Sequence, residues 1–237
     1  MKFSRIPLLL ALLAAFAVLF AGPGVRLGLW PFPVGFKIVQ YAALAALVAT
    51  VSGLLLMAVG KIRRTGLAAL VGAVAIGGLA AGVPGWQMRQ AYALPPIHDI
   101  STDTRDPPQF VAVLPLRADA PNPAEYGGEE IAAQQRAAYP KVVPLRLKAP
   151  PKIVFAKALD SARAMGWEIV AADAGSGRIE ATATTLMFGF KDDVVVRIRA
   201  EGRGSVVDVR SLSRVGRSDI GANARRIRTF MGRLQGS

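Results

Sequence analysis

Residues 192–215 read DDVVVRIRAEGRGSVVDVRSLSRV and contain two runs in which apolar and polar side chains alternate. Successive side chains of a β-strand point to opposite faces, so this period of two predicts two strands. The GRG between the runs is short enough to require that the strands be antiparallel neighbours. One face of the pair is apolar and is expected to lie under helices: Val194, Val196, Ile198, Ala200, Val207 and Val209.

Two more alternating runs precede this pair, GWEIVAAD at 166–173 and RIEATATT at 178–185. The short connections AGSG and LMFGFK extend the antiparallel pair into a four-stranded antiparallel meander. Residues 151–165, which begin with a proline and end before Gly166, have an apolar helical face, and so do residues from about 219 to 235. The order helix, four-stranded meander, helix predicts an α+β domain with its helices on one face of the sheet.

The second face of this sheet is expected to be a solvated lattice of charges paired across the strands. Its predicted members are Glu180, Thr182, Arg197, Arg199, Asp208 and Arg210. The stretch from Arg197 to Arg233 contains ten arginines and three acidic residues. Pairing within the stretch cannot neutralise them all, so a surplus basic patch is expected.

The front of the chain is apolar and contains no acidic residue before Asp99. Stretches at about 7–29, 36–60 and 65–83 are each long enough to cross a bilayer as a helix, which takes about 20 residues. The formal net charge of +13 therefore includes eight bases that flank membrane spans, and we expect no nucleic-acid partner. The absence of cysteine excludes disulfides and thiolate chemistry.

The basic residues predict the orientation of the spans. Lys2 and Arg5 precede the first span and KIRR at 61–64 follows the second, so both ends are expected in the cytoplasm. Three crossings would then place the C-terminal domain in the periplasm of a multi-pass inner-membrane protein. A cleaved signal peptide at the first span is an alternative that leaves the domain on the same side. Gly78 and Gly82 are expected to let the helices approach closely.

The segment 87–150 is rich in proline and is expected to be an extended linker with one short helix near 129–138. The predicted organisation is a transmembrane region at 1–86, this linker, and the α+β domain at 151–237. Aromatic residues near the span ends are expected at the membrane interface: Trp30, Phe32, Phe36, Trp86 and Tyr92.

The runs RIEATATTLMFGFKDDVVVRI and VDVRSLSRVGRSDIGANARRIRTF closely resemble the uncharacterised family DUF1499, and HDISTD at 98–103 and PPQF at 107–110 resemble its leading segment. The resemblance covers about 95–234 and implies a fold and a cell-envelope setting, but no reaction. The family's motif is matched at Arg210, Ser211, Ser213, Arg214, Gly216, Asp219, Gly221, Asn223, Arg226 and Ile227.

A candidate binding site follows from the arginines. Guanidinium groups bind carboxylates and phosphates in a bidentate manner, and a helix N-terminus offers free N–H groups to anions. The candidate ligand-binding residues are Arg197, Arg210, Arg214, Ser218, Asp219 and Asn223. The alternative is structural: the arginines form ion pairs, and Ser218 or Asp219 is simply a helix N-cap.

Three hypotheses for function remain open. The first is a non-catalytic domain that binds an envelope protein or an anionic ligand at the bilayer. The second is an enzyme whose site would gather Asp192, Asp193, Arg210, Arg214, Asp219 and Asn223 in one pocket. The third is a purely structural partner of another membrane protein. His98 is the only histidine, so no catalytic residue, metal site or cofactor is assigned.

Overall fold

The computed structural model describes residues 3–59 and 64–236, which form two compact units. The first unit comprises Met1–Tyr92 and Leu186–Gly189, and the second comprises Ala93–Thr185 and Phe190–Ser237. Lys2 and residues 61–63, on which much of the predicted orientation depends, lie outside the described residues.

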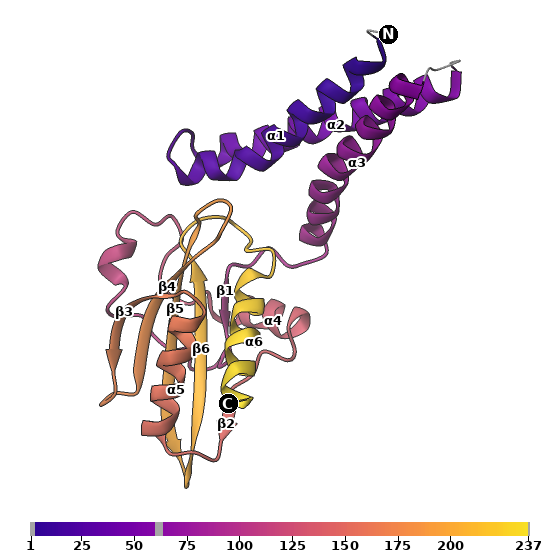
Figure 1. Ribbon diagram of the computed structural model, residues 1–237. Coiled ribbons are helices and arrows are strands. Elements are labelled where there is room, and N and C mark those ends of the chain that lie inside the picture. The colour runs from indigo at the N-terminus through magenta and orange to yellow at the C-terminus, as the bar shows by residue number, and fades with distance from the viewer. Residues whose placement is uncertain (1–2, 60–63, 237) are drawn as a thin grey trace. The chain divides into compact units, whose positions relative to one another are not determined.

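The first unit contains three long helices, α1 (Ile6–Arg26), α2 (Phe32–Val59) and α3 (Arg64–Tyr92), after a short 3-10 helix at Phe3–Arg5 (Figure 1). Each is long and apolar enough to cross a membrane, which confirms the three predicted spans. Helix α3 continues through Pro84, beyond its predicted end at 83. A proline removes a single backbone hydrogen bond, and transmembrane helices tolerate that loss.

Small side chains make the contacts among these helices, while large apolar side chains such as Leu13, which is 68% exposed, point outward. This is the distribution expected where lipid surrounds the bundle. Two alanine clusters lie between the helices: Ala11 with Ala49 and Ala73, and Ala14 with Ala46 and Ala80.

The glycine prediction in α3 is wrong in its position. A Cβ at Gly78 or Gly82 would have nothing within 4 Å, so neither residue makes a close helix contact. The close approach is at Gly77, where a Cβ would lie 2.6 Å from Thr50 Oγ1 and 2.7 Å from the Ala46 carbonyl oxygen. Spacing alone gave the right helix but the wrong face, because neighbouring glycines differ by 100° around the axis.

The predicted meander is present in the second unit as β3 (Glu168–Asp173), β4 (Arg178–Thr184), β5 (Lys191–Glu201) and β6 (Gly204–Ser213). The sheet nevertheless has six strands and not four. Strands β1 (Asp99–Ser101) and β2 (Leu145–Leu147) both pair antiparallel with the outer edge of β6. Each has three residues within a proline-rich segment, too few to show an alternating pattern.

Helices α5 (Pro151–Ala164) and α6 (Ala222–Gln235) lie over the apolar face of the sheet (Figure 1). Helix α4 (Gly128–Ala138) confirms the short helix expected in the proline-rich segment, and its Gln135 side chain bonds the backbone of Ser101 in β1. The first-face core includes Val194, Val196, Ile198, Val207 and Val209, as the alternation predicts, whereas Ala200 is exposed; α6 adds Ile227 and Phe230.

The second face of the sheet carries the expected cross-strand ion pairs of Asp208 with Arg197 and Arg199, but most of this face is covered and not solvated. Residues 102–126, with a 3-10 helix at Leu114–Arg117, supply the cover. Glu180 is 1% exposed, and its carboxylate accepts hydrogen bonds from the backbone N–H groups of Val111 and Val113. A small apolar cluster seals this layer: Phe110, Val113, Val195 and Leu212.

Candidate functional site

Arg210 on β6 is the largest of the fully buried side chains. Its Nε and Nη2 donate to the two carboxylate oxygens of Asp99 at 3.0 and 2.8 Å, and Nη2 also donates to the Ala124 carbonyl oxygen at 2.7 Å. The guanidinium carbon lies 4.9 Å from the ring centre of Phe110 and 5.4 Å from that of Tyr126. Arg210 therefore fastens β1 and the covering segment to β6 and is not presented to solvent.

Asp193 on β5 is the centre of a second buried group. It accepts hydrogen bonds from Arg117 Nη1 at 2.6 Å, from Arg214 Nε and Nη2 at 2.9 and 2.8 Å, and from Thr182 Oγ1 at 2.8 Å. One carboxylate thus joins the covering segment, two strands and the loop that follows β6.

Arg197 is paired with three carboxylates. Its guanidinium lies 3.0 Å from Asp208, 2.8 Å from Asp106 and 3.2 Å from Asp103. Asp106 and Asp103 precede Arg197 by 91 and 94 residues, so counting acids within 197–233 overestimated the surplus charge.

The pKa values of two of these buried carboxyl groups, Asp99 and Asp193, are shifted in opposite directions. Burial raises the pKa of Asp99 above its usual value, although the hydrogen bonds from Arg210 oppose the shift. Burial also acts to raise the pKa of Asp193, but hydrogen bonds from Arg214, Thr182 and Arg117 outweigh it, and the pKa is lowered. Burial, and then the nearby Asp99, raises the pKa of Tyr126 to about 12.

We expect Asp193→Asn to reduce the stability of the domain by about 2 kcal/mol at neutral pH, because two arginines lose a charged acceptor. The pKa of Asp193 is lower in the folded than in the unfolded chain, so its contribution is fully present above about pH 3.9. It is lost as the pH falls through the folded value. Urea unfolding at several pH values should show wild type and variant converging in acid, whereas the exposed Asp160→Asn should match wild type throughout.

Asn223, in the first turn of α6, is the centre of a group on the other face of the sheet. Its side chain accepts a hydrogen bond from Ser211 Oγ at 2.7 Å and donates to Ser213 Oγ at 3.0 Å and to the His98 carbonyl oxygen at 2.9 Å. Arg226 donates to Ser211 Oγ at 2.9 Å, to the carboxylate of Asp192 and to the amide oxygen of Asn223. This group ties the start of α6 to β5 and β6.

Asp219 and Ser218 shape the turn that precedes α6. The Asp219 carboxylate accepts from the backbone N–H groups of Gly221 at 2.8 Å and Asn223 at 2.7 Å, and burial raises its pKa. Ser218 Oγ accepts from the Ile220 N–H at 3.2 Å. Gly216 (φ 93°) and Gly221 (φ 71°) adopt left-handed conformations in the loop between β6 and α6, where glycine has no steric cost.

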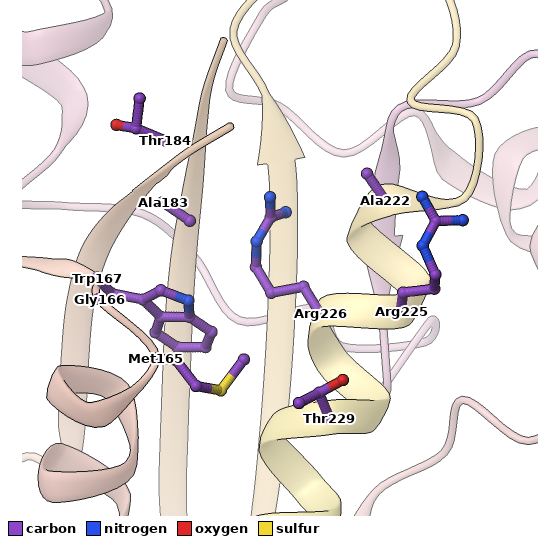
Figure 2. A pocket seen from close by; sticks show the side chains of 9 residues that line it. All are labelled: Met165, Gly166, Trp167, Ala183, Thr184, Ala222, Arg225, Arg226 and Thr229. Atoms are coloured by element: carbon purple, nitrogen blue, oxygen red, sulfur yellow. The ribbon is translucent and has the colours of Figure 1, made fainter. Parts of the chain in front are cut away.

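A groove of about 430 Å³ opens beside the N-terminal half of α6 (Figure 2). Figure 2 shows Trp167 on one wall and Arg226 projecting from α6 on the other. Apolar and hydroxyl-bearing side chains share the lining with two arginines: Met165, Gly166, Trp167, Ala183, Thr184, Ala222, Arg225, Arg226 and Thr229. Arg225 is exposed and its Nη1 donates to the Ile220 carbonyl oxygen at 3.0 Å, without a carboxylate partner among the described residues.

The candidate residues from the sequence do not surround this groove. Arg197, Arg210 and Arg214 lie on the covered second face, whereas Asn223 lies on the first. None of the six is among the described residues that line the groove, and their binding role stays a prediction. The convergence that the enzyme hypothesis requires is not found, because its six side chains are bonded in separate groups on two faces.

Sequence reasoning missed Arg226 as a lining residue. Its pairing with Asp192 turns it toward the sheet, and its side chain is only 11% exposed. In the sequence, the one indication that Arg226 faces the domain is its place in the matched motif, next to Ile227, which the structure shows to be buried. Trp167 and Thr184 carried no such signal, because they come from different elements and meet only in the folded domain.

No group of three or more metal-ligating side chains occurs in the part of the chain that the structure describes. His98 Nδ1 lies 3.3 Å from the Arg217 carbonyl oxygen, to which it donates when that nitrogen is protonated. This contact joins the residue before β1 to the loop between β6 and α6, 119 residues further along the chain.

The protein combines two parts. Three helices are able to cross a membrane, and a C-terminal α+β domain is built on a six-stranded sheet. The chain belongs to the family described as "Protein of unknown function (DUF1499)", whose model matches residues 99–234. A comparison with curated proteins gives no match. The matched region begins at β1 and ends in α6, so it coincides with the network described above: nearly every polar residue of the motif bonds another part of the domain.

Proposed function

We propose that this protein is a multi-pass protein of the bacterial inner membrane whose periplasmic domain binds an anionic ligand, without catalysis, in the groove beside α6. The observation that carries the proposal is the lining of the groove, which includes two arginines and Trp167; Figure 2 shows the Arg226 side chain projecting toward Trp167 and Arg225 on the other side of α6. Such a lining suits a ligand with an anionic head and an apolar part.

Arg225 is the lining arginine that has no carboxylate partner among the described residues. Arg226 is already engaged by Asp192, Asn223 and Ser211, so its charge is largely neutralised within the domain. The hydroxyl groups of Thr184 and Thr229 add hydrogen-bonding partners on the groove wall. The membrane setting is supported by the three spans and the orientation by the bases that flank them.

The test uses the full-length protein in detergent micelles and a short-chain phospholipid, dihexanoyl phosphatidylglycerol, as the anionic probe. We expect Arg225→Gln to weaken binding about tenfold, the loss that one charge-assisted hydrogen bond produces. Microscale thermophoresis measures the affinity, and dihexanoyl phosphatidylcholine tests the requirement for negative charge.

Arg228→Gln is the matched control, because Arg228 is an exposed residue of the same helix and is absent from the groove lining. It removes the same charge and should leave the affinity nearly unchanged. Equal losses for the two variants, or equal binding of the two lipids, would show that the groove does not select an anion.

A further inference from the structure

The covering segment protects only part of the second face of the sheet. Arg197 and Asp208 are cross-strand neighbours on this face, and their side chains are 19% and 0% exposed. Arg199 lies two residues further along β5, on the same face, and its side chain is 47% exposed. The cover therefore stops between these positions, and the charged side chains nearer the β5–β6 turn are open to solvent.

A pocket of about 300 Å³ lies on this open part of the second face. Val206 on β6 lines it, directly opposite Arg199 on β5 and Arg146 on β2. Directly opposite residues of antiparallel strands point to the same face, so these three side chains form one row across three strands. The lining also includes Glu201, at the end of β5, and Asp103, from the covering segment. The pocket thus gathers two guanidinium groups and two carboxylates beside an apolar side chain.

The charged groups of the pocket have hydrogen-bonding atoms that the domain itself does not use. Arg146 donates from Nε to Glu201 Oε2 at 2.8 Å, and its two Nη groups have no hydrogen-bond partner among the described residues. Arg199 donates from Nη2 to Asp208 at 2.8 Å, which leaves its Nη1 without a partner in the same part of the chain. Glu201 Oε1 likewise accepts no hydrogen bond from any described residue. The pocket therefore offers donors and an acceptor to a ligand at the same time.

A buried carboxylate holds one of these guanidinium groups in place. Asp208 has no exposed surface, and its Oδ2 accepts hydrogen bonds from both Arg197 and Arg199. Arg199 is therefore oriented before a ligand arrives, which reduces the entropy lost on binding. Asp208 Oδ1 is buried and has no hydrogen-bond partner among the described residues. Its negative charge lies next to Arg199, so the arginines do not make the pocket a site for simple anions.

The charge balance and the width of the pocket define the class of ligand. An ion of one sign would be attracted by the two arginines or by the two acids and repelled by the other pair, whereas a zwitterion satisfies both. Strands β2 and β5 flank β6, so their backbones are about 10 Å apart, wider than the spacing of the two charges in a single amino acid. The volume is at the lower end of the range for small-molecule sites.

We propose that this pocket binds a small zwitterion of the size of a dipeptide. The carboxylate of the ligand accepts hydrogen bonds from the unused N–H groups of Arg146 and Arg199, and its ammonium group donates to Glu201. The pocket is a second binding site, on the opposite face of the sheet from the groove beside α6. It does not depend on what the groove binds.

The test uses the full-length protein in detergent micelles and three probes that differ only in their ends. Alanylalanine carries both charges, N-acetyl-alanylalanine lacks the ammonium group, and alanylalanine amide lacks the carboxylate. Saturation-transfer NMR of the probe methyl groups measures the dissociation constants, with empty micelles as the blank. We expect alanylalanine to bind at least about tenfold more tightly than either capped form, because each cap removes a charge-assisted contact. No binding of alanylalanine, or equal binding of all three probes, would overturn the proposal.

Two variants connect the binding to the lining residues. Arg146→Gln should weaken the binding of alanylalanine about tenfold, because the carboxylate loses a charged donor. Glu201→Gln should remove the preference for alanylalanine over N-acetyl-alanylalanine, a change that a merely structural role of Glu201 would not produce. Both side chains are well exposed, so an unchanged midpoint of urea unfolding is expected for each variant.

Arg203→Gln is the matched control, because Arg203 is an exposed residue of the β5–β6 turn and is absent from the pocket lining. It removes the same charge at the same end of the sheet and should leave the affinity for alanylalanine unchanged. A loss equal to that of Arg146→Gln would assign the effect to long-range charge and would contradict binding in the pocket.

Discussion

Replacing Arg210 with alanine is expected to lower the free energy of unfolding of the domain by about 3–5 kcal/mol, because it leaves the Asp99 carboxylate buried without its partner. Arg210 is fully buried and Asp99 is 5% exposed, so water cannot take the place of the guanidinium. The substitution also removes the contacts with the rings of Phe110 and Tyr126. Pulse proteolysis of the full-length protein in micelles over a urea series measures the loss.

The control for charge is the double variant Asp99→Asn with Arg210→Met, which removes both members of the pair and approximates their volumes. It should recover part of the stability lost by Arg210→Ala, because no ionised group is left unpaired. Arg203→Ala, in the exposed β5–β6 turn, should change stability by less than about 0.5 kcal/mol. A loss below about 1 kcal/mol for Arg210→Ala would contradict the structural role assigned to the pair.

The second large effect is expected for Phe230→Ala in α6, which should cost about 3–5 kcal/mol. Phe230 has no exposed surface, and its ring stacks on Trp167 with 5.1 Å between the ring centroids. Truncation leaves a cavity under α6 that the packed sheet cannot close. The same proteolysis assay measures the loss, and we also expect a changed emission of Trp167.

Thr229→Ala is the matched control for packing, because Thr229 precedes Phe230 but is exposed at the edge of the groove. It should leave the stability within about 0.5 kcal/mol of wild type. If Phe230→Ala were equally mild, α6 would not be part of the core as described.

The regular elements could be predicted from local patterns. Alternation in residues 192–215 identified β5 and β6 and the face that lies under the helices, and three apolar runs identified the membrane helices. The cover on the second face could not be predicted, because residues 102–126 have no period and form little regular structure. Their contribution depends on single residues, such as Phe110 and Arg117, that find partners far along the chain.

The motif residues were identified from the sequence, but their role was not. An arginine that binds a ligand and one that binds a buried aspartate have the same signature in the sequence, and the difference lies in where the partner is. Asp99 is 111 residues from Arg210, and Asp106 is 91 residues from Arg197. The groove was missed for a related reason, since the α5–β3 connection, β4 and α6 each contribute only part of its lining.

The long separation between Asp99 and Arg210 has a consequence during synthesis. Translation runs from the N-terminus at roughly 5–20 residues per second, so Asp99 exists for about 6–20 s before the ribosome adds Arg210. During that interval β1 has no β6 to pair with, and the covering segment has no sheet to cover. The nascent domain therefore has to keep its first strand solvated until β6 has been made, and only then can the sheet and its cover close.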